Sequence, residues 1–341
     1  MFIKTIIQGR LEFGNEKSYQ KVYKMFEYRT ETYYKSDVIV KQEEVFDDEV
    51  LSLEIPRYVG QHFDKSYRNT VSLLEYCAQF AVAGEIRAWQ TDRGTVLSYT
   101  YIEPQSDKAV VTDFIKGKNL IGEDGREEEA IKALSDAIEK YNRHAYAYEK
   151  RGEVNYMLKK YHDALRDFNK CIAIDATIPD AYMGRANIAF MNEDYQEAAD
   201  NLELTLKLSI ALQNIYWKAR KLKAICHIKL KQYEKAAFDL KLYSNRKFAD
   251  DDPNKKWQQT ATIEYLKALI ELEDYAEAFS LLVNIESVNV EMPKYEGLLY
   301  YFRGRAKHNI GKKGHLKDLK KGIELKCKEA EAYLKDIKKQ K

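Results

Sequence analysis

A tyrosine followed three positions later by an alanine recurs through the second half of this 341-residue chain. The phrase reads Tyr161-His-Asp-Ala164, then Tyr195-Gln-Glu-Ala198, then Tyr233-Glu-Lys-Ala236, so the alanines lie 34 and then 38 residues apart. Self-similarity at such a period is typical of proteins built from stacked copies of one supersecondary unit. We therefore expect a repeat array, in which each unit buries its apolar face against its neighbours.

Two copies can be aligned position by position, one starting at Ala145 and the next at Pro179. Large residues stand at positions 4, 17 and 24, and small residues at positions 8 and 20. The first copy has Tyr148, Gly152, Tyr161, Ala164 and Phe168, and the second has Tyr182, Ala186, Tyr195, Ala198 and Leu202. Small side chains let two helices approach closely, and the large ones fill the space around that contact.

This pattern resembles the tetratricopeptide repeat, a helix hairpin of about 34 residues. The resemblance implies an all-α superhelical solenoid over about residues 111–341, with about six hairpins and a capping helix at Lys328–Lys339. The other copies are less regular. The fifth has Leu266 where a small residue is expected, which leaves the place of its first helix open.

The resemblance also implies that positions 2, 5, 9, 12 and 13 of each first helix line a concave groove, which binds a partner protein or peptide. Carried over residue by residue, these groove positions are Tyr146, Glu149, Glu153, Tyr156, Met157, Met183, Asn187, Phe190, Met191, Lys218, Lys221, Tyr301, Arg305 and His308. They begin acidic and turn basic, which favours a peptide or helix of opposite polarity. Alternatively, these side chains pack against the N-terminal segment or another subunit.

Some members of the family clamp a partner's terminal carboxylate, with Lys at position 5 and Asn at position 9 of one repeat. Here Glu149 and Glu153 stand at those two positions. Binding of this particular kind is therefore not expected.

Residues 1–105 lack the repeat pattern, and their hydrophobic pattern predicts an α+β domain. Alternating patterns predict strands at 2–13, 36–41 and 49–55 and a closing hairpin at 85–90 and 94–102. Helical spacing predicts helices at 16–34 and 67–82. This β-α-β-β-α-β order resembles a ferredoxin-like sandwich. Because that fold hosts many activities, it assigns none.

Few residues suggest chemistry, and we expect no catalytic site, cofactor or metal. Gly117–Asp124 has the first spacing of a phosphate-binding loop but lacks the Lys-Ser/Thr pair that such a loop needs. The acid pairs Glu43-Glu44 and Asp47-Asp48 could bind a cation, although such runs are more often solvated loops. The four cysteines lie too far apart for a zinc or redox motif, so we expect reduced, buried thiols.

No stretch of about 18 uncharged apolar residues exists, so no membrane span is expected. Free thiols, no signal peptide and no N-x-S/T sequon together favour the cytoplasm. The 26 tyrosines and many lysines hint at a bacterial source. The basic run Lys312–Lys321 could contact nucleic acid, anionic lipid or an acidic partner, but a basic, soluble cap is the favoured interpretation. The balanced charge of the chain argues against nucleic-acid binding. The oligomeric state stays open.

The sequence therefore predicts a non-enzymatic scaffold or adaptor that binds a partner peptide or helix in the repeat groove. One alternative is a small-ligand sensor or enzyme in the N-terminal domain, targeted by the repeats. Another is an RNA- or ribosome-associated factor that docks through the basic C-terminal segment.

Overall fold

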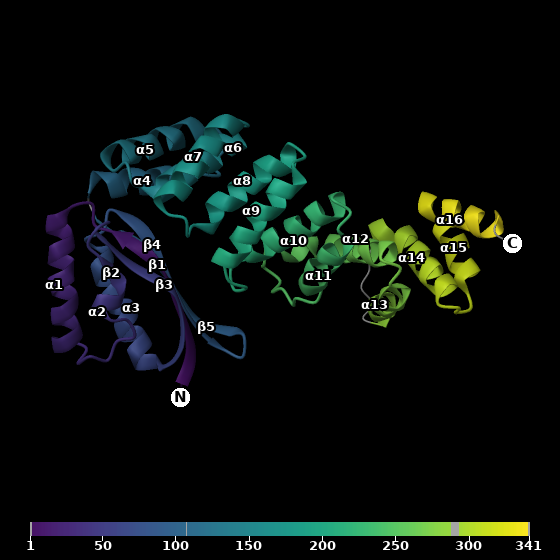
Figure 1. Ribbon diagram of the computed structural model, residues 1–341, viewed down its shortest axis with the longest axis horizontal. Coiled ribbons are helices and arrows are strands. Elements are labelled where there is room, and N and C mark those ends of the chain that lie inside the picture. Colours follow the sequence, from purple (N-terminus) through teal and green to yellow (C-terminus); the bar gives the residue numbers. More distant parts are fainter. Residues whose placement is uncertain (1, 107, 288–292, 340–341) are drawn as a thin grey trace. The chain divides into compact units, whose positions relative to one another are not determined.

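The computed structural model describes residues 2–106, 108–287 and 293–339. Its N-terminal part combines one sheet with three helices (Figure 1). In chain order the elements are β1 (Phe2–Glu12), α1 (Glu16–Thr32), α2 (Gln42–Val45), β2 (Phe46–Asp47), β3 (Ser52–Phe63), α3 (Asp64–Ala78), β4 (Ala83–Asp92) and β5 (Thr95–Ile102).

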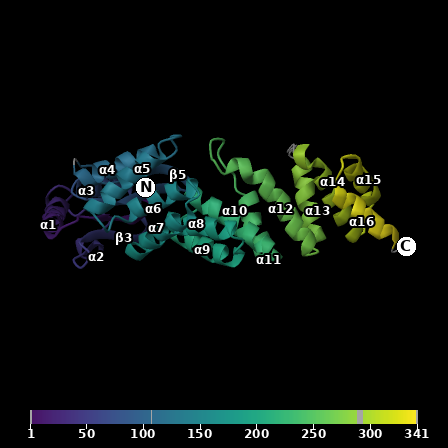
Figure 2. The same cartoon turned by 90° about the horizontal axis from the view of Figure 1, so that it is seen from above.

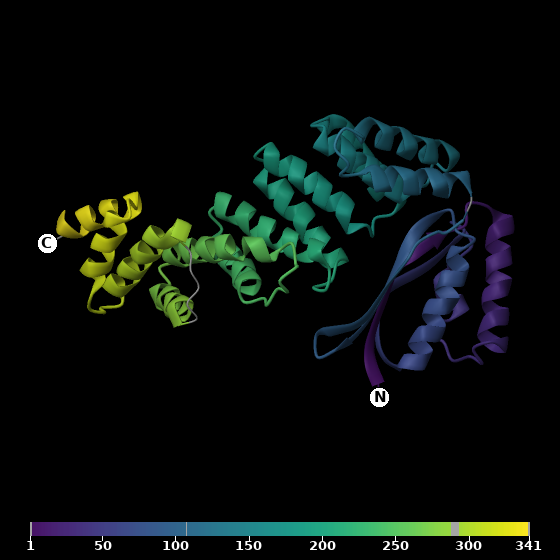
Figure 3. The same cartoon turned by 180° about the vertical axis from the view of Figure 1, so that it is seen from behind.

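The sheet is antiparallel throughout its described pairs and has the order β2-β3-β1-β4-β5. Helices α1 and α3 lie on the same face of it (Figures 1 and 3). Alternate strand residues such as Ile7, Leu11 and Ile86 point into the core on that side, together with Phe26 of α1 and Leu74 of α3. This core follows from the period-2 pattern of the strands and the helical spacing of the two helices.

The predicted helices at 16–34 and 67–82 and the closing hairpin are confirmed as α1, α3 and β4–β5. The predicted strand at 49–55 begins at Ser52 and continues to Phe63. The structure has the β-α-β-β-α-β order, but its second strand is only two residues long. It also has two further elements, α2 and β5.

The predicted strand at 36–41 is wrong, because this run is a loop of which only Val40 is fully buried. Lys35 and Ser36 have left-handed backbones, with φ of 51° and 59°, which turns the chain after α1. The Ile39 amide donates to Thr70 Oγ1 at 2.8 Å, and Val40 is buried in the core. The loop therefore satisfies its backbone through α3 rather than through a strand partner.

The rest of the chain is helical, and consecutive helices pair as hairpins (Figures 1 and 2). The elements are α4 (Ala109–Leu120), α5 (Glu127–Lys140), α6 (Ala145–Met157), α7 (Tyr161–Ile174), α8 (Pro179–Met191), α9 (Tyr195–Leu208), α10 (Asn214–Lys229), α11 (Tyr233–Ser244), η1 (Lys255–Trp257), α12 (Gln258–Glu271), α13 (Tyr275–Ser287), η2 (Pro293–Tyr295), α14 (Glu296–Asn309), α15 (His315–Glu324) and α16 (Lys328–Lys339).

The predicted register matches these bounds closely. Helices α6 and α8 begin at Ala145 and Pro179, and the last helix has the bounds expected for the cap. The tyrosine of the recurring phrase begins α7, α9 and α11, and Tyr275 begins α13 in the same way.

A repeated turn explains why the second helices begin there. The residue two positions before each of these tyrosines has a left-handed backbone, with φ between 58° and 63° at Lys159, Glu193, Lys231 and Glu273. The next amide donates to the carbonyl five residues back, as Lys160 does to Asn155 at 2.8 Å. This hydrogen bond closes the first helix in a Schellman motif, so the second helix starts after a fixed turn.

Glycines let a large ring enter between the helices. Phe168 of α7 lies against Gly152 of α6, where an added Cβ would be 2.8 Å from the ring. The same ring also lies against Gly184 of α8. The small residue at position 8 therefore makes room for the large residue at position 24, and Gly117 and Leu134 repeat this contact in the first hairpin.

Several hairpins also contain a buried ion pair. The base stands directly before position 8 and the acid directly before position 24. Arg151 of α6 donates to both carboxylate oxygens of Asp167 of α7 at 2.9 and 2.7 Å. The corresponding pairs are Lys223–Asp239, at 3.2 Å, and Arg303–Asp318, at 2.7 Å.

The chain divides into two compact units, residues 1–184 and 185–341, and the division falls within α8. The first unit contains the sheet core and a second cluster, in which the start of β4 packs with α4–α6. The predicted domains, 1–105 and 111–341, follow a different division, which separates the sheet and its helices from the helical repeats. These domain bounds stay a prediction. They also include residues 1, 288–292 and 340–341, which lie outside the described residues.

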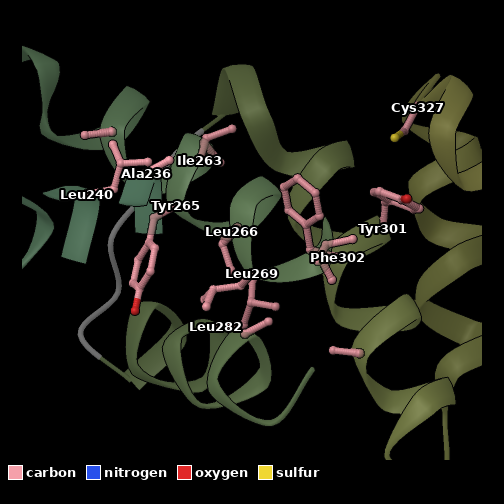
Figure 4. Close-up of a cluster of buried hydrophobic side chains, with 14 of the residues drawn as sticks. Ala236, Leu240, Ile263, Tyr265, Leu266, Leu269, Leu282, Tyr301, Phe302 and Cys327 are labelled. Atoms are coloured by element: carbon pink, nitrogen blue, oxygen red, sulfur yellow. The ribbon is translucent and has the colours of Figure 1, made fainter. Parts of the chain in front are cut away.

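The second unit has its own apolar core. Figure 4 shows Leu266 and Leu269 of α12 gathered with Leu282 of α13 and Phe302 of α14. Leu266, where the repeat pattern expects a small residue, is fully buried in this cluster. The fifth copy therefore forms a hairpin with a leucine at this position.

Candidate partner-binding surface

The groove positions on α6 contact other parts of the first unit. Tyr146 packs against the cluster that joins α4–α6 to the start of β4, and Glu149 is only 3% exposed. Burial raises the pKa of Tyr146, and the nearby Glu85 of β4 raises it further. Lys150 Nζ lies 3.2 Å from Glu149 Oε2 and 2.9 Å from Glu153 Oε2. The packing of Tyr146 with Val82 and Ala83 favours the alternative that groove residues contact the N-terminal segment.

The sheet is tied to the first hairpins by polar contacts as well. The Tyr141 hydroxyl donates to Glu12 of β1, and Lys118 of α4 pairs with Glu103. Burial raises the pKa of Glu12, which is 3% exposed. These contacts and the shared apolar cluster join the sheet to α4–α6 within the first unit.

The end of α6 and the groove positions on α8 are more open. Met157 is 47% exposed and Met191 is 52% exposed, whereas Met183, Asn187 and Phe190 are half-buried. In the second unit, the ring centroids of Phe190 and Tyr195 lie 5.5 Å apart. Lys229 Nζ of α10 lies 5.9 Å from the Tyr195 ring, so aromatic and basic side chains meet at this end of the helices.

The groove positions on α10 lie beside a residue pair that the sequence analysis missed. Lys218 is exposed, and the half-buried Lys221 has its Nζ 4.0 Å from the centre of the Trp257 ring. Lys256 Nζ lies 5.4 Å from the same ring. Trp257 and Lys256 belong to η1, which follows a loop that the repeat register leaves unassigned. The sequence signal was the run Lys255-Lys256-Trp257, an aromatic beside two lysines directly before a helix.

The groove positions on α14 are engaged by the capping helix. Tyr301 is 7% exposed and accepts from Arg305 Nη1 at 2.8 Å. His308 Nδ1 lies 2.9 Å from the Tyr333 hydroxyl of α16, which also accepts from Asn309 at 2.8 Å. Tyr333 was not expected in this set, because the register stops at the cap. The predicted groove residues therefore differ in exposure: Glu149 and Tyr301 are buried, whereas Met157, Met191 and Lys218 are exposed.

Two surface pockets lie outside these positions. One, of about 500 Å³, lies between α9, α10 and α11, where Phe238 and the Lys223–Asp239 pair line it. The other, of about 600 Å³, lies in the sheet domain and is lined by Glu43, Glu44, Asp47 and other acids. Within the described ranges, no group of three or more His, Cys, Asp or Glu side chains could hold a metal ion.

The expected state of the cysteines is confirmed, since all four are free and buried. Burial raises the pKa of the Cys77 and Cys226 thiols to about 12. A thiol with so high a pKa is a poor nucleophile at neutral pH. None of the helices that the structure describes has the length and apolar character needed to cross a membrane.

Comparison with known proteins decides the class of the helical array. No protein-family model matches the chain, and no curated protein sequence matches it either. Among solved structures, YrrB, described as a TPR protein with an unusual peptide-binding site, matches 60% of this chain and 99% of its own, at 19% identity and a TM-score of 0.50.

The helical array is a tetratricopeptide-repeat fold. Two further similar structures are PilF from Pseudomonas aeruginosa and a tetratricopeptide-repeat protein from Parabacteroides merdae. The first matches 67% of this chain and 98% of its own, at 13% identity and a TM-score of 0.46. The second matches 90% of this chain and 93% of its own, at 13% identity and a TM-score of 0.38.

Proposed function

We propose that the chain is a non-enzymatic interaction adaptor, which binds a partner peptide or helix at the groove positions of the second unit, on the end of α8 and on α10. The observation that carries this proposal is the difference in solvent exposure between the predicted groove positions. Glu149 on α6 and Tyr301 on α14 are 3% and 7% exposed, whereas Met191 is 52% exposed and Lys218 is exposed. Exposed methionine and aromatic side chains suit adaptable recognition of apolar anchors.

The comparisons and the chemistry of the side chains support the same proposal. YrrB, which shares the repeat fold, is described as having a peptide-binding site. The buried thiols of this chain are poor nucleophiles, which favours binding over catalysis. Reduced buried thiols also support a cytoplasmic location.

The N-terminal domain, residues 1–105, is proposed to be a ferredoxin-like variant that supplies a second contact. Its order β2-β3-β1-β4 supports this, since β3 and β4 are joined through α3 and flank β1. We keep residues 111–341 as the repeat domain, although the first hairpins share a compact unit with the sheet.

Site-specific photocross-linking in the native cell tests the adaptor. A benzoylphenylalanine replaces Met191 or Lys218, and matched controls carry it at Leu204 and Phe238, which are 40% and 64% exposed on the second helices. We expect one partner to be enriched from positions 191 and 218 and not from the controls. The enriched protein is then purified and its affinity measured by calorimetry. Equal yields from all four positions, or no binding by calorimetry, would reject the groove as the site.

A further inference from the structure

Three lysines and one exposed tryptophan converge in the second unit. Lys218 and Lys221 stand one turn apart on α10, and Lys256 and Trp257 come from η1. The ammonium groups of Lys221 and Lys256 lie 4.0 and 5.4 Å from the centre of the Trp257 ring. We call these four residues the basic cluster.

The positive charges of the basic cluster are uncompensated. Within the described part of the chain, no ion pair joins a carboxylate to Lys218, Lys221 or Lys256. Their neighbours differ: Lys223 Nζ lies 2.8 Å from Glu203 and 3.2 Å from Asp239, and Lys255 pairs with Asp250. The lack of partners is therefore local to the basic cluster rather than general to the lysines of this region.

Burial makes this arrangement costly for the free protein. Burial, together with the smaller effect of the Lys256 and Lys218 charges, lowers the pKa of Lys221 to about 8. The face of an aromatic ring attracts a cation, but this attraction is modest at an exposed site. An anion placed among the three ammonium groups would remove the repulsion between them.

The surface beside the basic cluster is apolar. Ile225 and Ile228 follow Lys218 and Lys221 at helical spacing on α10, and both are partly exposed. Trp257 is 43% exposed, whereas Trp89 and Trp217 are 3% and 9% exposed. The complementary ligand therefore carries carboxylates next to aromatic or aliphatic side chains. A nucleic-acid backbone offers phosphates but no aliphatic side chains, so it matches the lysines and not the two isoleucines.

We propose that the basic cluster binds an acidic, aromatic-containing peptide segment, with carboxylates on the three lysines and an apolar side chain against Trp257 and Ile225. This inference rests on the proposed function and names the chemistry of the partner. It differs from the carboxylate clamp of other repeat proteins, since two of its four residues come from a segment between repeats.

Fluorescence anisotropy with the full chain tests the charge preference. The probes are labelled ten-residue peptides of alternating Glu and Phe or of alternating Lys and Phe, and a labelled uridine decamer. We expect the Glu–Phe peptide to bind best, with an affinity that falls as salt is added. Lys221→Glu and Lys218→Glu should each weaken it at least ten-fold. Lys235→Glu, on α11, makes the same charge change at another exposed lysine and should have little effect.

Quenching of tryptophan fluorescence gives a second measurement that needs no peptide. Iodide, an anion, should quench the exposed Trp257 more strongly relative to acrylamide than expected for a neutral surface. Lys221→Glu should reduce the iodide quenching at least two-fold and leave the acrylamide quenching unchanged, which also shows that the fold is intact.

Three outcomes would overturn the inference: equal losses of peptide affinity in Lys235→Glu and Lys221→Glu, tighter binding of the uridine decamer, or unchanged iodide quenching in Lys221→Glu. Its failure is distinct from failure of the adaptor. If position 191 cross-links to one partner but the chain shows no preference for acidic peptides, the adaptor function stands. Only the proposed chemistry of the ligand is then rejected.

Discussion

The ring of Phe168 lies between glycines on two different helices, Gly152 on α6 and Gly184 on α8. It is 2% exposed, so the ring cannot move aside into solvent. Close packing leaves no space for an extra methyl group at either glycine. At the scale of single residues, the spacing of these helices therefore depends on the lack of a side chain at Gly152 and Gly184 as much as on the ring.

We predict that Gly184→Ala lowers the free energy of unfolding by about 1–3 kcal/mol, because its Cβ overlaps the Phe168 ring. Chemical denaturation followed by circular dichroism measures the change. In a Phe168→Leu background the same substitution should cost less, because the smaller side chain leaves room. If the two substitutions are additive, the ring is not the cause.

His144 predicts a dependence of stability on pH. It is 1% exposed, its Nδ1 accepts from the Ala147 amide at 3.2 Å, and burial lowers its pKa from 6.5 to about 3. In the unfolded chain the imidazole of His144 is protonated below pH 6.5, whereas in the folded chain it is protonated only below about pH 3. The free energy of unfolding therefore falls as the pH falls through this range.

The substitution His144→Asn keeps a side chain that caps α6 and removes this titration. Between pH 6.5 and 5, the wild type should lose about 1–2 kcal/mol more of its free energy of unfolding than the variant does. Urea denaturation at the two pH values measures the difference. Parallel losses in both proteins would show that His144 does not titrate on unfolding.

At the scale of elements, each hairpin joins two helices by packing and, in several copies, by a buried ion pair. Arg151 and Asp167 have side chains that are 19% and 2% exposed. On the same α7, Arg166 and Asp163 form an ion pair one turn apart at 2.8 Å, with side chains 73% and 45% exposed. Both are Arg–Asp ion pairs, and they differ in burial. We therefore expect burial to decide how much each pair contributes to the free energy of unfolding.

We predict that Asp167→Asn lowers the free energy of unfolding by about 2–3 kcal/mol, because it leaves the Arg151 charge buried without its counter-charge. Asp163→Asn should change it by less than about 1 kcal/mol, since water replaces the lost partner. Thermal and urea denaturation of both variants provide the comparison. Similar effects of the two substitutions would mean that burial of the pair is unimportant.

At the scale of the whole molecule, the chain has two compact units with separate apolar cores. The first combines the sheet with the first hairpins, and the second contains the remaining helices. Local stability in repeat arrays follows nearest neighbours, so the two units need not lose their structure together.

Hydrogen exchange followed by mass spectrometry tests this division. Asp167→Asn should reduce protection within residues 1–184 and leave residues 185–341 unchanged, and Asp239→Asn should do the reverse. The physical reason is that each substitution disturbs only the core to which its helix belongs. Reduced protection across the whole chain in either variant would show that it unfolds as one cooperative unit.

The repeat array was predictable because its information is local. The tyrosine at position 17 follows a fixed turn, and the small residue at position 8 admits a large one at position 24, so spacing alone located α6–α9. The strand predicted at 36–41 failed for the opposite reason. Its valines and isoleucine are apolar enough for a strand, but the Ile39 amide donates its hydrogen bond to Thr70, some thirty residues away.

The sequence by itself determined the hairpins, their register and the set of residues that could face a groove, because helix periodicity and turn geometry act over a few residues. Only the tertiary structure decided which of those residues remain available. Tyr146 is covered near β4 and Tyr301 is engaged near α16, through contacts between segments distant in the sequence. It also brought Lys256 and Trp257 beside Lys221, because the loop before η1 returns to α10.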